Sequence, residues 1–69
     1  MRYAVVMEWA GENYSAYVPD LPGCISTGRT IEETEQNIAG AIAFHLESMR
    51  EDGDAIPPPT THVAELEII

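Results

Sequence analysis

The sequence is short of basic residues, and this shortage excludes one class of binding protein. Three arginines and no lysine stand against twelve carboxylates, which gives a net charge of −9. A protein that binds DNA or RNA needs a cluster of Lys and Arg to replace the counterions along the phosphates. No such cluster exists in this sequence, so we expect no direct binding of nucleic acid.

Cysteine and histidine are also scarce. The single cysteine, Cys24, excludes an internal disulfide, and two histidines make a poor metal set. A chain of 69 residues makes one domain at most and buries only about 60% of the surface that its unfolded form exposes. Small domains of this kind lean on disulfides, metals or self-association, so we predict a homo-oligomer with no metal and no cofactor.

Long apolar runs are absent as well. No segment is apolar over enough residues to cross a bilayer, and the first residues lead into a strand-like pattern without a signal-peptide cleavage site. We therefore predict a cytoplasmic protein with no membrane partner. The unpaired cysteine fits a reducing compartment.

The excess of acidic residues has two explanations. It favours fast association with a basic surface, so a basic protein is the natural partner. It also keeps a small protein soluble, and on charge alone this second explanation is the stronger one.

Two segments rich in β-branched and aromatic residues predict a hairpin. They span about residues 3–10 and 14–18. A four-residue loop, 10–13, gives the hairpin one wholly apolar face, whereas a shift of one residue would turn every side chain over. In that register the apolar pairs are Trp9 with Tyr14, Met7 with Ala16, and Val5 with Val18. The outer face then carries Glu8, Ser15 and Tyr17.

Prolines and a glycine interrupt the chain after the hairpin. Pro19, Pro22 and Gly23 require a turn or a bulge at this point. Residues 24–27 are then long enough for a short third strand, which ends at Gly28.

A long helix is predicted over about residues 31–52. Thr30 and Glu33 have the spacing of a capping box, in which the threonine hydroxyl accepts from the N–H of Glu33 while the carboxylate reaches back. Gly53 suits the position after the last turn. Apolar residues recur at intervals of three, four and seven and form one stripe. The stripe contains Ile31, Ile38, Ile42, Leu46 and Met49, with Ala39 and His45 beside it.

This helix is as long as the whole domain. It spans about 33 Å at 1.5 Å per residue, whereas a compact chain of this length has a diameter of about 28 Å. Its last turns would overhang the sheet, so Leu46 and Met49 are candidates for an interface between subunits.

The end of the chain predicts a fourth strand. The three prolines at 57–59 predict a stiff connector that brings the chain back along the helix. Residues 63–69 alternate as a strand does, with Ala64, Leu66 and Ile68 under the helix. The expected fold is therefore α+β in the order βββαβ, with an antiparallel sheet packed on one long helix.

Three stretches of the sequence together resemble a known family. They are YSAYVPDLPGC at 14–24, TIEETEQNI at 30–38 and DGDAIP at 52–57. Their order closely resembles the signature of the HicB family of antitoxin-like proteins, Y-x-A-x-V-P-D-L-P-G-C, then T-x-E-E-A-x-x-N-I, then E-x-G-x-x-I-P-x-P. Thr34 or Glu35 stands where alanine is commoner. The resemblance covers nearly the whole chain, so we expect residues 1–69 to form a single domain of this kind.

The resemblance implies a partial ribonuclease-H-like fold and an antitoxin's role. The partner that it implies is a small, basic, HicA-like toxin that cleaves mRNA with a histidine, and the antitoxin covers that site. Many members of the family continue into a DNA-binding domain that represses their own operon. This sequence ends at its last predicted strand, so we expect no such repression from it.

Five residues are candidates for contact with the partner. Asp20, Leu21 and Pro22 lie in the predicted turn, where Asp20 would offer a carboxylate to a basic surface. Turn chemistry explains the same residues, about equally well for Asp20 and slightly better for Leu21. Tyr17 and Glu8 lie on the outer face of the hairpin, where tyrosine is a favoured interface anchor.

The sequence offers no convincing set of catalytic residues. A nucleophilic thiolate needs a nearby base, but His45 lies beside the apolar stripe with no signal that it reaches Cys24. Two-metal cleavage needs several carboxylates that converge, whereas the glutamates of the predicted strands are at outward positions. We therefore predict a binding protein and not an enzyme. The alternative to an antitoxin is a structural or regulatory homo-oligomer without a toxin partner.

Overall fold

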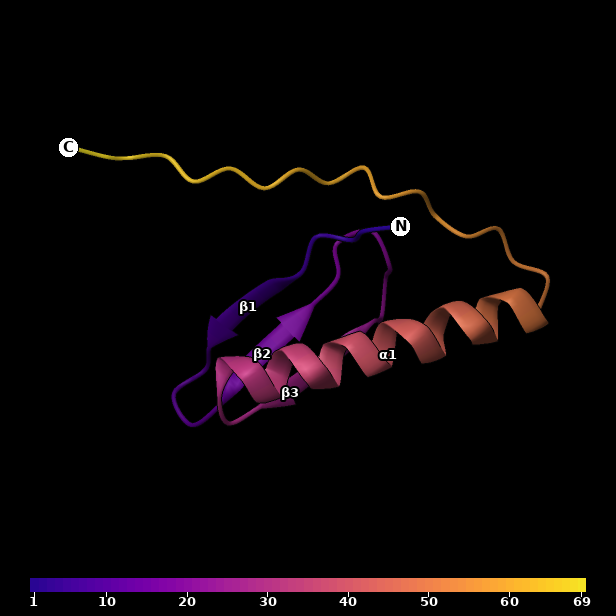
Figure 1. Cartoon of the computed structure of the whole chain (residues 1–69), viewed down its shortest axis with the longest axis horizontal. Helices are drawn as coiled ribbons and strands as arrows, with labels where there is room; N and C mark the ends of the chain where they lie inside the picture. The colour runs from indigo at the N-terminus through magenta and orange to yellow at the C-terminus, as the bar shows by residue number, and fades with distance from the viewer.

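Three short antiparallel strands and one long helix form the frame of the chain (Figure 1). The strands lie in the order β1-β2-β3 in one sheet. The predicted α+β class and the order of these elements are confirmed. The computed structural model describes residues 1–69 and contains β1 (Val6–Trp9), β2 (Tyr14–Tyr17), β3 (Ile25–Gly28) and α1 (Ile31–Glu51).

The hairpin has the predicted loop length and the predicted register. Met7 of β1 lies opposite Ala16 of β2. The N–H of Ala10 donates to the carbonyl of Asn13 at 2.8 Å and closes the loop between the strands. Because side chains alternate along a strand, this register turns the apolar set toward the helix and leaves Tyr17 on the other face.

The start of α1 is capped almost as predicted. Thr30 Oγ1 accepts from the N–H of Glu33 at 3.0 Å. The Glu33 carboxylate reaches one residue farther back than expected and accepts from the N–H of Arg29 at 3.2 Å. The cap therefore also fixes the short link between β3 and the helix.

The end of α1 is a Schellman motif. Gly53 has a φ of 74°, in the left-handed region that favours glycine. Its N–H donates to the carbonyl of Arg50 at 3.2 Å, and the N–H of Asp54 donates to the carbonyl of Met49 at 2.9 Å. These two bonds satisfy carbonyls that the last turn leaves free, and they end the helix one residue before the predicted end.

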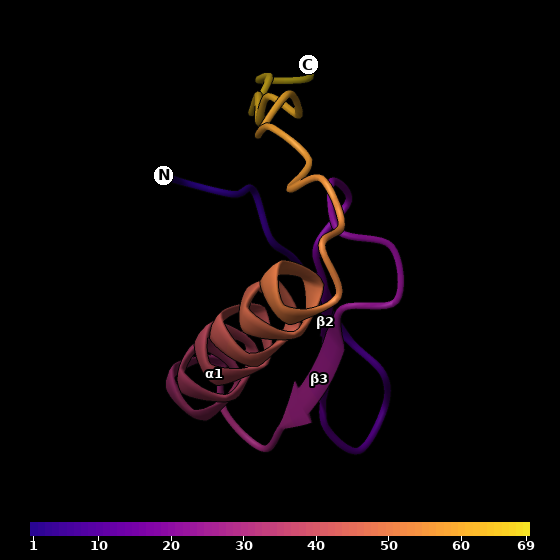
Figure 2. The same cartoon turned by 90° about the vertical axis from the view of Figure 1, so that its right-hand side faces the viewer.

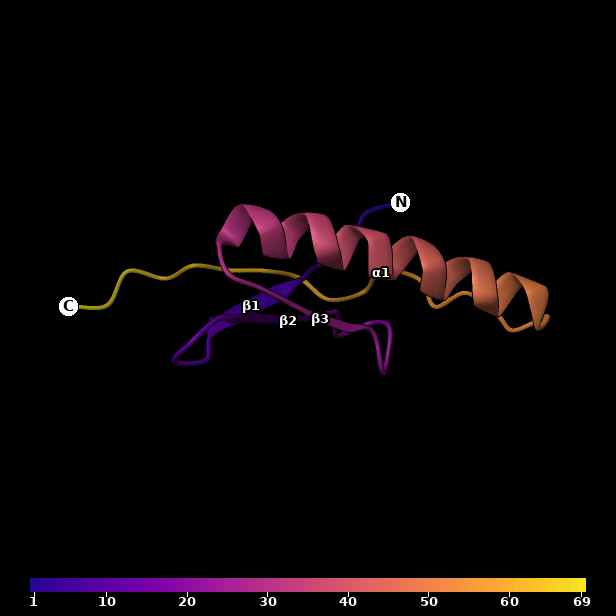
Figure 3. The same cartoon turned by 90° about the horizontal axis from the view of Figure 1, so that it is seen from below.

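The molecule has two layers, with α1 on one face of the sheet and the other face open (Figures 2 and 3). The helix lies over β3 and β2 and leaves β1 largely uncovered. Asn37 Nδ2 donates to the carbonyl of Thr27 at 2.8 Å and ties the helix to β3. The core between the layers is small, and its buried apolar residues are Ala16, Val18, Leu21, Cys24, Ile38 and Leu46.

Thr34, which the predicted stripe omits, is fully buried. Its hydroxyl donates to the carbonyl of Thr30 at 2.7 Å, and its side chain lies against Gly28 of β3. Ile31, which the stripe includes, is 43% exposed. The helix and β3 approach so closely here that the inward position goes to a small side chain opposite a glycine.

The predicted fourth strand, 63–69, does not form within this chain. Residues 54–69, which we call the tail, run back past the β1 side of the molecule (Figure 1). No residue beyond Asp54 makes a backbone–backbone hydrogen bond. A strand needs a neighbour for its N–H and C=O groups, and the tail has none here. The prediction of a strand was therefore wrong for the isolated chain, because alternation carries no information about whether a partner strand is present.

We expect Gly28→Ala to lower the free energy of unfolding by about 1–3 kcal/mol, because overpacking a tight contact costs that much. A Cβ at Gly28 would lie against Thr34 Oγ1 and at 2.7 and 2.8 Å from the N and Cα of the same residue, and this backbone is held by the helix. Gly40→Ala is the matched control. Gly40 is exposed in mid-helix with nothing within 4 Å of an added Cβ, so alanine should add about 0.5–1 kcal/mol. Urea unfolding at one protein concentration measures both, and equal effects would contradict this packing.

Candidate partner-binding surface

Two successive β-turns follow β2 and shape the motif that the sequence singles out. The N–H of Leu21 donates to the carbonyl of Val18 at 3.0 Å, and that of Cys24 donates to the carbonyl of Leu21 at 3.0 Å. In the second turn Pro22 presets one central φ and Gly23, at φ 83°, takes the other, which is the pattern of a type II turn. The double turn places Leu21 in the core, where it is fully buried.

The carboxylate of Asp20 holds the start of the tail. Its Oδ2 accepts from the N–H groups of Thr60 and Thr61, each at 3.1 Å. Its Oδ1 accepts from their hydroxyls, at 3.1 and 2.9 Å. The hydrogen bond from the Thr61 N–H lowers the pKa of Asp20 the most. Desolvation opposes it with a smaller effect, and the three other hydrogen bonds lower the pKa further. Asp20 therefore makes an internal contact, and its use by a basic partner stays a prediction.

The face of the sheet away from α1 carries apolar side chains across all three strands. Val6 lies opposite Tyr17, and Tyr17 lies opposite Ile25. Tyr17 is 42% exposed and Ile25 is 69% exposed. We name these three residues the apolar row.

A polar row runs beside the apolar row on the same face. Glu8 lies opposite Ser15, and Ser15 lies opposite Thr27. Glu8 is exposed and supplies the carboxylate of this row. Exposed apolar side chains bordered by polar ones are typical of a protein–protein contact surface, so the open face is the candidate site.

The structure separates the predicted contact residues into three groups. Tyr17, Glu8 and Pro22 are exposed, the first two on the open face. Asp20 is half-buried and bonded to the tail, and Leu21 is inaccessible in the core. Their contacts with a partner stay predictions.

The two helix residues predicted at a subunit interface lie on the inner side of α1. Leu46 is buried in the core of its own chain at 9% exposure, and Met49 is half-buried. An interface through them also stays a prediction, and Met49 is the more accessible of the two.

Besides Ile31 and the apolar residues of the tail, three more apolar side chains are exposed without having been predicted so. Ile25 belongs to the apolar row, and strand alternation from Cys24 was the signal that placed it outward. Phe44, 75% exposed, lies on the outward side of α1, off the predicted stripe. Trp9 was expected to pack in the core or over the sheet. It packs edge-to-face on Tyr14 with ring centroids 5.0 Å apart, yet it is 58% exposed because α1 does not cover β1.

No three His, Cys, Asp or Glu side chains lie close enough together to hold a metal ion, and the molecule has no pocket. Burial raises the pKa of the Cys24 thiol, which disfavours the reactive thiolate. The helix is not long and apolar enough to cross a membrane.

The sequence matches known proteins over most of its length. A family model for the HicB-like antitoxin of bacterial toxin–antitoxin systems matches residues 3–68. An uncharacterized 14.9 kDa protein of Haemophilus phage HP1 is 42% identical over 57 residues, which are 83% of this chain and 43% of that protein. A UPF0150 protein of Synechocystis is 37% identical over 69 residues, which cover 99% of this chain and 87% of that protein. The chain thus spans under half the length of the phage relative and most of the Synechocystis one.

Comparison with a solved structure agrees with this family match. A chain from a structure of the HicA3 and HicB3 toxin–antitoxin complex superposes with a TM-score of 0.74 at 30% identity, over 86% of this chain and 70% of that one. The fold is that of a small α+β domain of the HicB type. The chain belongs to the HicB-like antitoxin family.

We expect the contact between Asp20 and the tail to be lost in acid. The folded pKa of Asp20 is lowered, so its contribution to stability is fully present above the ordinary aspartate pKa of about 3.9. It disappears as the pH falls through the lowered folded value. The amide NMR signals of Thr60 and Thr61 should therefore titrate together with a midpoint below about 3.9.

Asp20→Asn is the control for this titration, because an amide keeps the shape of the side chain without its titrating group. In that variant the two threonine signals should stay constant over the same pH range. A midpoint above the ordinary aspartate value in the native protein would contradict the hydrogen-bonded geometry.

Proposed function

We propose that this protein is an antitoxin that binds and neutralises a small, basic, mRNA-cleaving toxin of the HicA type and catalyses no reaction itself. The observation that carries the proposal is the match to a chain of the HicA3 and HicB3 complex, at 30% identity and a TM-score of 0.74. A ribonuclease-H-like relationship and a cytoplasmic location belong to the same proposal.

The open face of the sheet is the proposed contact surface for the toxin. Tyr17 lies at the centre of the apolar row, between Val6 and Ile25, and tyrosine in such a position is a favoured anchor. Glu8 offers a carboxylate beside the row to a basic group of the toxin. The other carboxylates of a chain with net charge −9 steer a basic partner toward it and speed association.

A second candidate function is a structural or regulatory homo-oligomer without a toxin. It is favoured by the small extent of the core, since only eight of 69 residues are buried. Self-association and toxin binding use different surfaces in our account, so the two functions are separable by experiment.

Co-expression tests the proposed pairing directly. A short, basic reading frame next to the gene should arrest growth when it is expressed alone, and this chain should restore growth. The two proteins should also elute from a sizing column as one complex. Persistent toxicity together with separate elution would rule out the antitoxin function.

Charged substitutions in the apolar row locate the contact surface. Tyr17→Asp and Ile25→Asp should each weaken toxin binding by about 30-fold or more, because loss of a central anchor costs about 2 kcal/mol or more. Phe44→Asp is the matched control, as it places the same charge at an exposed apolar residue of the helix. Titration calorimetry with purified toxin measures all three. If Phe44→Asp alone weakened binding, the toxin would bind the helix and the surface assigned here would be wrong.

A further inference from the structure

Residues 63–69 form an apolar segment with no partner in their own chain. Val63, Leu66 and Ile68 are 74%, 79% and 84% exposed, although apolar and charged residues alternate as in a half-buried strand. The preceding part of the tail is held at two points. Tyr3 donates its hydroxyl to the carbonyl of Pro57, and Asp20 binds the two threonines that follow the prolines. The chain is thus anchored up to residue 61 and leaves the body only beyond it.

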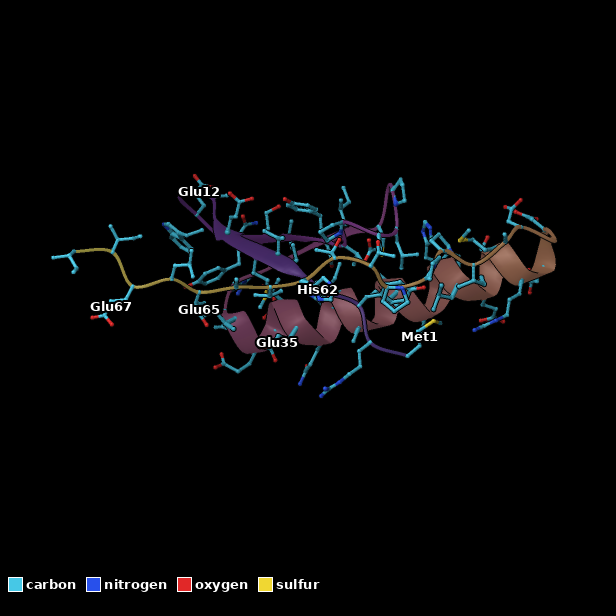
Figure 4. The ribbon with its side chains drawn as sticks, turned by 90° about the horizontal axis from the view of Figure 1, so that it is seen from above. Met1, Glu12, Glu35, His62, Glu65 and Glu67 are labelled. Carbon is cyan, nitrogen blue, oxygen red and sulfur yellow. The ribbon has the colours of Figure 1, made fainter.

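The orientation of this segment does not suit packing on its own core. Glu65 and Glu67 project from the tail toward the side of the helix layer (Figure 4). Because side chains alternate along an extended chain, Leu66 then lies on the side away from that layer. To pair with its own β1 with Leu66 facing the core, the segment would have to rotate about its own axis after Thr61, where Asp20 holds the tail.

β1 has one edge without a neighbouring strand. It is an edge strand of the sheet, and the helix leaves its inner face largely uncovered. Met7 is half-buried and Trp9 is 58% exposed on that face. Natural edge strands are usually protected by charged side chains, above all lysine, by proline or by a bulge. β1, with the sequence VMEW, has no lysine, no proline and a single charged residue, Glu8.

The single chain exposes more surface than a typical folded monomer of the same mass. Its accessible area is 5372 Å², whereas a folded monomer of 7.6 kDa exposes about 4,300 Å². Its radius of gyration is 13.4 Å, against about 11 Å for a compact chain of this length. The excess is about 1,100 Å² per chain, so two chains would bury about 2,200 Å² if they covered it, which is the range of obligate homodimers.

We propose that residues 63–69 of each chain add to the free edge of β1 in a second copy, so that two chains exchange their last strands. Each segment supplies the backbone partners that β1 lacks, and Leu66 and Ile68 cover the exposed side of Met7 and Trp9 of the other copy. The fourth strand that the sequence predicts then exists in the dimer and not in the isolated chain. The open outer face stays free, so this dimer does not depend on toxin binding.

Cross-linking between isotopically distinct chains tests the exchange. A photo-reactive phenylalanine analogue replaces Leu66 in full-length chain, which is mixed in equal amounts with ¹⁵N-labelled native chain, unfolded and refolded together. We expect cross-links from residue 66 to peptides that contain β1, with the ¹⁵N mass in the captured peptide. Cross-links to β1 that stay within one isotope would show that the tail pairs with its own sheet and would overturn the proposal.

A second measurement uses light scattering on the native chain and two variants. The native protein should have twice the mass of one 7.6 kDa chain. Leu66→Asp combined with Ile68→Asp should raise the dimer dissociation constant by about 100-fold or more, since both aliphatic side chains lose their apolar burial. Phe44→Asp, which changes an exposed residue outside the exchanged strand, should keep the native mass. A native protein that stays monomeric at about 100 μM, where weak dimers with micromolar constants form, would overturn the proposal, as would a dimer unaffected by the double substitution.

Discussion

One helix can cover only one face of a sheet, and the rest of this structure follows from that constraint. The helix α1 contains 21 residues and the three strands together contain 12. The chain has no second helix to cover the other face of the sheet. The helix lies over β3 and β2, so both the outer face and the β1 edge remain without cover. A domain with so small a core gains stability by giving those surfaces to other chains. The fold therefore leaves two surfaces that another chain could cover.

The turn after β2 connects the core to these outer surfaces. Leu21 points inward and closes the core, while Asp20, one residue earlier, points outward and accepts four hydrogen bonds from the tail. The motif that identifies the family is thus explained largely by internal structure. A carboxylate in a family signature is easily taken for a partner contact, but here its four bonds go to Thr60 and Thr61. Of the predicted contact residues, Tyr17, Glu8 and Pro22 stay exposed, and the first two lie on the open sheet face.

Local chemistry made much of the fold predictable from the sequence. The capping box at Thr30, the glycine at 53 and the alternation of the hairpin fixed the helix ends and the strand register within about one residue, because each depends on neighbours in sequence. Burial was less predictable where it depends on contacts between elements. Thr34 is buried because Gly28 lies opposite it, and Trp9 is exposed because the helix leaves β1 largely uncovered. That residues 63–69 find no partner strand in this chain was beyond sequence reasoning for the same reason. In the candidate site, the outward positions of Tyr17, Glu8 and Ile25 follow from alternation, whereas the place of Ile25 directly beside Tyr17 needed the pairing of β2 with β3.

We propose that this antitoxin-family protein binds its partner through the uncovered outer face of the sheet. A methyl NMR titration of the labelled chain with the purified basic toxin tests this proposal. We expect the methyl signals of Val6 and Ile25 to shift and saturate at one toxin per chain, while that of the buried Ile38 stays in place. Saturable shifts confined to the outward helix methyls, such as that of Ala43, or no shifts at all, would contradict it.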